Sequence, residues 1–119
     1  MNRYTLYCTE SQTRKALELG APIESYPLVI SPYGVPKFES QGIAYILPTT
    51  DQMINWVEEQ EGIRCIEVTG SFGWHYRVKK KHDDVENWIQ GTCQTRKEAT
   101  LAAIGAALEY LTKQTKHRK

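Results

Sequence analysis

Three repeats of one helix-start signal constrain this chain more than any other feature of its sequence. A threonine is followed three residues later by glutamine or glutamate at Thr9/Gln12, Thr49/Gln52 and Thr95/Glu98. In a pair with this spacing, called a capping box, each side chain satisfies a backbone N–H group that the first turn of a helix leaves unpaired. Gly20 and Gly62 stand where two of these helices would end, since glycine readily adopts the left-handed conformation found there. The sequence therefore predicts helices near residues 10–19, 50–60 and 95–113.

The middle predicted helix has one apolar side. With 3.6 residues per turn, the apolar side carries Met53, Ile54, Trp56 and Val57, and the opposite side carries Asp51, Asn55, Glu58 and Glu59. This pattern is typical of a surface helix that packs one side on a core. It predicts that Glu58 and Glu59 face solvent.

The last predicted helix has two apolar sectors. Its small residues are Ala99, Ala102, Ala103 and Ala106, and its bulky residues are Leu101, Ile104, Leu108 and Leu111. A narrow polar strip remains, formed by Glu98, Gly105, Glu109 and Thr112. We expect the bulky sector to lie on a sheet and the alanine sector to let another helix approach to about 8 Å. That second helix could belong to the same chain or to a second copy, so a dimer formed through the alanine sector is one of two alternatives.

Two β-rich segments before the last helix predict a hairpin. Residues 63–69 and 74–80 alternate apolar and polar side chains on either side of a turn that contains glycine. The alternation places Trp74, Tyr76 and Val78 on one face and His75, Arg77 and Lys79 on the other. We therefore expect the two aromatic side chains to be buried.

The register of this hairpin follows from the need to join the two apolar faces. A loop with an odd number of residues, such as 69–73, sets Val68 opposite Trp74 and Ile66 opposite Tyr76. A weaker third strand, interrupted by a glycine, is predicted around Asn87–Thr92.

These elements predict one α+β domain with three parts. Residues 1–48 form an N-terminal strand-helix unit and an extended arm, in which residues 21–42 carry four prolines and a short strand is expected at Leu28–Ile30. Residues 49–113 form an α-β-β-β-α unit, with an antiparallel three-stranded sheet covered by helices on one face. Residues 114–119 form a basic tail.

Composition excludes several classes of protein. A chain of 119 residues, 40% of them hydrophobic, can bury a core without metals or disulfides. No apolar segment has the length of a signal-peptide core or a membrane span, so we expect a cytoplasmic location. Cys8, Cys65 and Cys93 are odd in number and far apart, which favours reduced thiols over disulfides or a zinc site. No catalytic, dinucleotide-binding, phosphate-loop or metal-ligand motif occurs, so we expect neither an enzyme nor a bound cofactor or metal.

Charge is distributed unevenly along the chain. Residues 1–62 carry 4 basic and 8 acidic side chains, a net charge of −4, and residues 63–119 carry 11 basic and 6 acidic side chains, a net charge of +5. Such asymmetry is typical of an anion-binding half or of parts that attract each other in the folded chain or a dimer. The candidate nucleic-acid-binding residues are Arg77, Lys79, Lys80, Lys81, Arg96 and Lys97. Without exposed aromatic side chains, we expect them to give only weak, salt-sensitive binding to duplex RNA or DNA, without sequence preference.

The order helix, three strands, helix from residue 49 onward, together with "TRKEATLAAIGAALEYL", resembles the double-stranded RNA-binding domain. That family opens its last helix with two basic residues, a spacer, an alanine and a third basic residue. Arg96, Lys97 and Ala99 match this pattern, and Thr100 stands at its last position. The resemblance implies phosphate contacts from Arg96 and Lys97, with the first helix and the first hairpin loop reaching neighbouring minor grooves. The loop "GSFG" lacks the proline and histidine of the family.

A second resemblance covers nearly the whole chain. The phrases "YCTESQTRKALELGAPIE", "PTTDQMINWVEEQ" and "TRKEATLAAIGAALEYL" look like those of short, uncharacterised proteins encoded by gut-bacterial prophages and phages. This resemblance implies a mobile-element accessory protein and carries no activity with it. We therefore expect a small non-enzymatic binding or interaction module, with an unknown protein partner or self-association, and nucleic-acid binding as the alternative.

Overall fold

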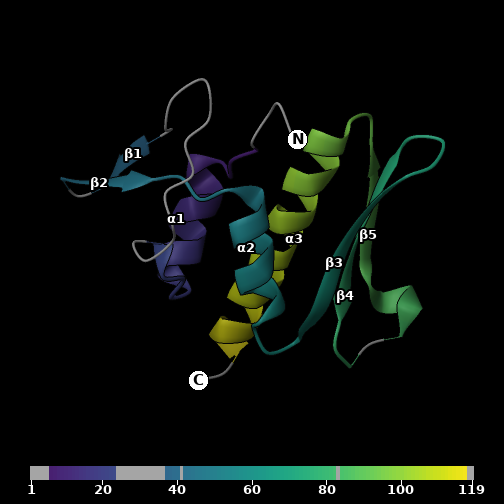
Figure 1. The fold of residues 1–119 in the computed structure, drawn as a ribbon. Helices are drawn as coiled ribbons and strands as arrows, with labels where there is room; N and C mark the ends of the chain where they lie inside the picture. The colour runs from purple at the N-terminus through teal and green to yellow at the C-terminus, as the bar shows by residue number, and fades with distance from the viewer. Residues whose placement is uncertain (1–5, 24–36, 41, 83, 118–119) are drawn as a thin grey trace.

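The computed structural model describes residues 6–23, 37–40, 42–82 and 84–117 (Figure 1). Its helices are α1 (Glu10–Glu18), α2 (Thr50–Glu58) and α3 (Arg96–His117). One antiparallel sheet contains, in spatial order, β3 (Ile63–Gly70), β4 (Trp74–Lys80) and β5 (Ile89–Cys93). A separate hairpin contains β1 (Lys37–Ser40) and β2 (Ile43–Ile46), and the short 3-10 helix η2 (Val85–Asn87) precedes β5. These elements confirm the predicted α+β class and the three-stranded antiparallel sheet.

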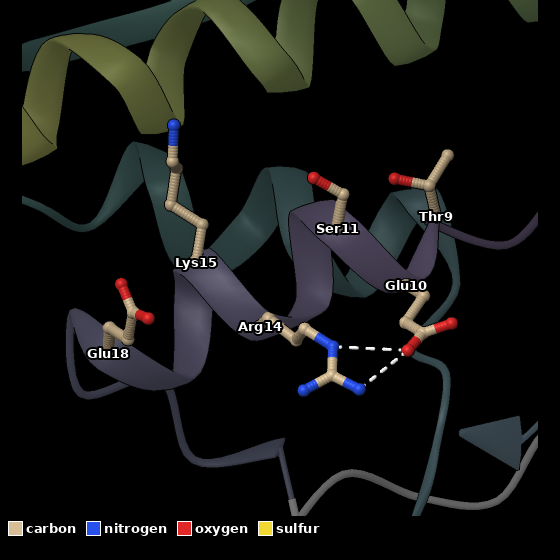
Figure 2. Close-up of a pocket in the computed structure, with 6 residues that line it drawn as sticks. All are labelled: Thr9, Glu10, Ser11, Arg14, Lys15 and Glu18. Atoms are coloured by element: carbon tan, nitrogen blue, oxygen red, sulfur yellow. Dashed lines mark hydrogen bonds and ion pairs between the residues drawn. The ribbon is translucent and has the colours of Figure 1, made fainter. Parts of the chain in front are cut away.

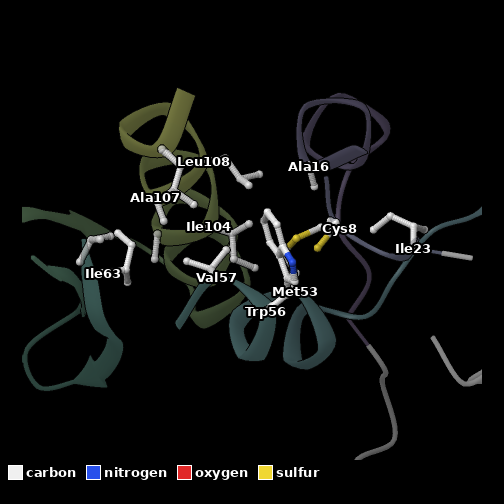
Figure 3. Packing of buried hydrophobic residues seen from close by; sticks show 14 residues of the cluster. Cys8, Ala16, Ile23, Met53, Trp56, Val57, Ile63, Ile104, Ala107 and Leu108 are labelled. Carbon is white, nitrogen blue, oxygen red and sulfur yellow. The ribbon is translucent and has the colours of Figure 1, made fainter. Parts of the chain in front are cut away.

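Helix α3 lies at the centre of the packing. It contacts all three strands of the large sheet, α2 packs on both α3 and β3, and α1 packs on α3. Figure 1 shows these helices on one face of the sheet, and within the described ranges no α-helix packs on the other face, which we call the helix-free face. One hydrophobic cluster joins the layers and includes Cys8, Ala16, Val57, Ile63 and Leu108 (Figure 3). Of the helices described, none is both long and apolar enough to cross a bilayer.

All three predicted helix starts are capped by their threonines. Thr49 Oγ1 accepts a hydrogen bond from the Gln52 N–H at 3.1 Å, and the Gln52 side chain accepts one from the Thr49 N–H at 2.9 Å. The box at Thr9 is complete in the same way. At the start of α3, Thr95 Oγ1 accepts from the Glu98 N–H at 3.1 Å and donates to the Glu98 carboxylate at 3.2 Å. The capping pattern therefore located each helix start correctly.

Helix α3 continues past its predicted end at residue 113. Gln114 Nε2 donates to the Tyr110 hydroxyl at 2.7 Å, one turn earlier in the helix. The Gln114 side chain also lies over Gly62, where an added Cβ would come within 2.7 Å of it. Residues 114–117, predicted as part of a basic tail, are therefore helical, and glycine at position 62 leaves room for the Gln114 side chain.

The chain segments that lead into α1 and α2 pair with each other. Cys8 N–H donates to the Pro48 carbonyl oxygen at 2.9 Å, and Thr50 N–H donates to the Leu6 carbonyl oxygen at 2.9 Å. Tyr7 and Thr49 form an isolated antiparallel bridge. The strand predicted before α1 is therefore, in its described part, a single bridge.

The two apolar sectors of α3 face the opposite way from the prediction. Figure 3 shows Ile104 and Leu108 on the side of α3 that faces Cys8 and Ala16, and Gln12 Nε2 of α1 donates to the Leu101 carbonyl oxygen at 2.7 Å. The bulky sector therefore faces the other helices.

The alanine sector of α3 faces the sheet. Tyr110 lies seven residues after Ala103, on the same side of the helix, and the Lys80 ammonium of β4 sits 5.2 Å from its ring centroid. Bulky sheet residues, such as the fully buried Val78, fill the space that alanines leave. Ala99 and Ala103 have no exposed surface in the single chain, whereas Ala102 and Ala106 of the same sector are partly exposed.

The β3–β4 hairpin has an odd loop, as predicted, but its pairing is shifted by two residues. Val68 pairs with Tyr76 and Ile66 with Val78, and the loop contains only residues 71–73. Phe72 and Gly73 adopt positive φ angles of 52° and 108°. These left-handed conformations close the turn within three residues instead of the five predicted, so β3 extends to Gly70.

Two glycines in the sheet make room for aromatic rings on β4. Trp74 lies over Gly70, with ring atoms 3.0 Å from the position of a Cβ, and Tyr76 lies over Gly91, with its hydroxyl 2.5 Å from that position. Gly91 is therefore part of β5, where its lack of a side chain leaves room for the Tyr76 ring. Trp74 and Tyr76 are half-buried, although we expected them to be fully buried.

The β1–β2 hairpin was not predicted from the sequence. Gly42, with a φ of 78°, lies between the two strands, so "QG" before the apolar run "IAYI" was the available signal. The short strand expected at Leu28–Ile30 lies outside the described residues.

Glu58 does not face solvent as predicted. Its carboxylate accepts a hydrogen bond from the Ile66 N–H of β3 at 3.0 Å. In an antiparallel pair, the N–H groups of alternate residues point away from the partner strand. The Ile66 N–H, opposite Val78 of β4, points away from β4 in this way, to the free edge of β3. The carboxylate therefore occupies an edge position that could otherwise pair with another strand. Glu59, the next residue, is exposed.

We expect Glu58→Ala to destabilise the fold by about 1–2 kcal/mol, because it leaves a strand N–H without its charged acceptor. Glu59→Ala is the matched control and should change the free energy of unfolding by less than about 0.5 kcal/mol. Urea unfolding followed by circular dichroism measures both. Equal effects of the two variants would show that the Glu58–Ile66 bond contributes nothing to stability.

Gly105→Ala should stabilise the protein by about 0.5–1 kcal/mol, since alanine loses less conformational freedom than glycine in a helix. The added Cβ would lie 3.4 Å from Gln12 Nε2, an ordinary contact with the end of a side chain. The midpoint of urea unfolding tests this. A destabilised variant would mean that the Gln12–Leu101 hydrogen bond requires glycine beside it.

Candidate functional site

The lysine run at the end of β4 is divided among different surroundings. Lys79 lies on the helix-free face of the sheet, where its Nζ pairs with Glu67 Oε2 at 2.8 Å and sits 5.1 Å from the Trp88 ring centroid. Lys80 points to the helix face and lies over Tyr110. Lys81 is exposed in the turn after the strand, where its N–H donates to the Gly62 carbonyl oxygen at 2.9 Å. The run therefore does not form one cationic surface.

Arg96 and Lys97 lie at the opposite end of the sheet. They are exposed in the first turn of α3, which follows β5 directly, and Cys93 of β5 pairs with Trp74 at the start of β4. The seven residues of β4 span about 20 Å between this end and the lysine run. The six predicted cations thus fall at two ends of the molecule, with Arg77 exposed on the helix-free face between them.

The β3–β4 loop lies at the same end as Arg96 and Lys97. The Cβ position of Gly73 is 3.9 Å from the Cys93 carbonyl oxygen, and the chain reaches Arg96 three residues after Cys93. Phe72, between Ser71 and Gly73, is completely exposed, with a relative accessibility of 107%. We call the loop 71–73 together with Arg96 and Lys97 the tip end; Figure 1 shows the loop and the start of α3 at the same end of the sheet.

The loop that carries Phe72 is held by hydrogen bonds on both sides. Ser71 N–H donates to the Gly73 carbonyl oxygen at 2.8 Å, and His75 Nε2 lies 2.9 Å from the Ser71 carbonyl oxygen. Trp74 packs over Gly70 below the loop. The exposed ring is therefore supported by an ordered turn.

Sequence reasoning missed Phe72 as a site residue. The alternation that governs Trp74 and Tyr76 does not extend into the turn before them, so it could not predict whether the Phe72 ring is buried or exposed. The available signal was a large aromatic residue directly before glycine in a tight turn, a position where small or polar residues are usual.

The thiols and the carboxylates offer little chemistry. Cys8 is buried, and loss of solvation raises the pKa of its thiol to about 12. Its Sγ lies 3.8 Å from the Thr49 carbonyl oxygen. Cys65 and Cys93 are free thiols that are partly exposed. Among the described residues, no group of three or more potential metal ligands comes together.

A shallow pocket lies along α1 (Figure 2). Its lining residues come from the helix and its cap: Thr9, Glu10, Ser11, Arg14, Lys15 and Glu18. Arg14 forms an ion pair with Glu10 at 2.6 Å, one helical turn away, and both side chains are about half exposed. A single exposed helix face provides no sheltered wall for chemistry, so this pocket is a weaker candidate than the tip end.

The pKa of Glu67 reports on its ion pair with Lys79 across the sheet. The hydrogen bond from Lys79 lowers the pKa of the Glu67 carboxyl below its usual range, and the positive charges of Lys79 and Arg77 add to this effect. We expect a carbon-detected NMR titration to show a lowered Glu67 midpoint that rises in Lys79→Met. Because the pKa is lower in the folded state, the pair stabilises the fold above the usual glutamate pKa and loses this effect as the pH falls through the lowered value. Lys81→Met is the control, and a Glu67 midpoint unchanged by Lys79→Met would contradict the pairing.

Comparisons with protein-family models, with curated proteins and with solved structures found no match to this chain. Function must therefore be inferred from the side chains and their arrangement. The tip end combines cations and an exposed aromatic ring, and it is the strongest candidate among the described residues.

Proposed function

We propose that this chain is a non-enzymatic binding module and that its ligand is nucleic acid, bound at the tip end. The observation that carries this proposal is the sheet register, which places the loop with Phe72 at the same end of the sheet as the helix start with Arg96 and Lys97. Cations supply attraction for phosphates, and an aromatic ring supplies a surface for bases.

The charges at the start of α3 favour an anionic ligand. Arg96 and Lys97 form no ion pair within the described part of the chain, and both stand at the positive end of the helix dipole, where cations are unfavourable. Glu98, the acidic residue of this turn, is engaged by the Thr95 hydroxyl. A bound phosphate would offset the repulsion that these two cations experience in the free protein.

The order α2-β3-β4-β5-α3, with helices on one face of the sheet, supports a fold like that of the double-stranded RNA-binding domain. The resemblance would assign phosphate contacts to Arg96 and Lys97. Helix α2 favours no such role, because Asp51 and Glu59 are exposed on it and Glu58 binds the β3 edge. We therefore restrict the proposed site to the tip end, with Arg77 beside it on the helix-free face.

The wider setting of the protein is also a proposal. The phrase resemblances favour an accessory protein of a prophage or phage, and free thiols at Cys65 and Cys93 suit a reducing compartment such as the cytoplasm. The exposed Phe72 would also suit insertion into a pocket of a partner protein, which is the second candidate function. Self-association stays an alternative, since Ala102 and Ala106 of the alanine sector are partly exposed.

Arg96→Glu/Lys97→Glu should weaken nucleic-acid binding at least about tenfold and lower the salt dependence of log affinity by about two. Fluorescence anisotropy with labelled single strands and duplexes, over a range of salt concentrations, measures both. The substitutions place acids at a helix start, where they are favourable, so unfolding would not account for the loss.

The matched control is Lys81→Glu/Lys113→Glu, which makes the same change in net charge at the far end of the molecule. Both lysines are exposed. The control should keep its affinity within about threefold, because charges more than a Debye length from the site are screened. Equal losses in the two variants would show nonspecific attraction, and no binding by the unmodified protein would refute the proposed function.

A further inference from the structure

We propose that Phe72 stacks on an unpaired base, so that the preferred ligand is single-stranded nucleic acid rather than a perfect duplex. This inference rests on the proposed function and adds to it the class of nucleic acid. It concerns a side chain that the packing of the fold does not use.

Phe72 gains nothing from the folded chain in which it lies. Its side chain is completely exposed, and its φ of 52° is unfavourable for a residue with a Cβ. Asparagine or glycine would suit this turn position better. A large apolar side chain held in solvent in an unfavourable conformation is typical of a contact residue.

The other aromatic side chains of the sheet are already engaged. Trp74 and Tyr76 lie over glycines of neighbouring strands, and Trp88 lies under Lys79. Tyr110 of α3 accepts a hydrogen bond from Gln114 and lies under Lys80. Phe72 is therefore the ring at the tip end with both faces accessible.

The charge around Phe72 favours a nucleic acid over an apolar protein pocket. Arg96 and Lys97 lie at the same end of the sheet. An apolar pocket would remove water from Arg96 and Lys97 without offering them a charged partner. A nucleotide, in contrast, presents a phosphate and a base face a short distance apart.

A single projecting ring favours unpaired bases. In a duplex, both faces of each base are covered by its neighbours, so a ring can enter only by unstacking a step, which costs free energy. An unpaired base offers its face directly. Stacking by one ring, with phosphates held by two cations, also predicts little sequence preference.

Three variants at position 72 test this inference in the same anisotropy assay, with a labelled single strand and its duplex. Phe72→Leu keeps an apolar side chain of similar bulk but removes the aromatic face, so single-strand affinity should fall about tenfold while duplex affinity stays unchanged. Phe72→Trp should retain single-strand affinity, with its emission quenched on binding. Phe72→Asn should also lose single-strand affinity, and because asparagine tolerates positive φ its melting temperature should equal or exceed that of the unmodified protein.

The outcomes separate this inference from the proposed function. Equal affinity of Phe72→Leu and the unmodified protein for the single strand, with Arg96→Glu/Lys97→Glu still impaired, would overturn stacking and leave the nucleic-acid site standing. Equal losses for single strand and duplex would also overturn the preference for unpaired bases. Absence of any binding by the unmodified protein would overturn both proposals and favour a protein pocket for Phe72.

Discussion

Covering helix α3 on both sides is the requirement on which the rest of the structure depends. Ala103, Ile104, Ala107 and Leu108 all have no exposed surface, so the helix cannot be stable beside the sheet alone. The sheet covers its small side, and α1 and α2 cover its bulky side. The N-terminal segment is therefore part of the core, as the complete burial of Ala16 shows.

Local signals in the sequence predicted the elements, and contacts between elements decided how they meet. Each capping threonine located a helix start, because the hydrogen bonds involved join residues three apart. The orientation of α3 could not be predicted in this way, because either apolar sector could face the sheet. The choice depends on bulky sheet residues such as Val78, which fill the space beside the alanines. The hairpin register likewise depended on the fit of Trp74 over Gly70.

The candidate site was only partly predictable for the same reason. Arg96 and Lys97 could be named as cations, but which cations share a surface depends on strand length and register, and β4 separates them from Lys80 and Lys81. Helix periodicity predicted that Glu58 faces solvent, because periodicity within one helix carries no information about the neighbouring strand edge. Phe72 stands in a turn, where periodic patterns make no statement about exposure.

The paired entrances of α1 and α2 have a consequence for how this chain could change length. Ile23 and Cys8 belong to the same cluster (Figure 3), and the Cys8 N–H donates to the Pro48 carbonyl oxygen, so Cys8 links positions 23 and 48 of the chain. Lengthening a loop whose two ends are held in place adds little entropy cost, about 0.6 kcal/mol for each doubling of its length. The β1–β2 hairpin, which lies between these two positions in the sequence, is therefore a natural place for insertion, deletion or grafting of another peptide without disturbing α3.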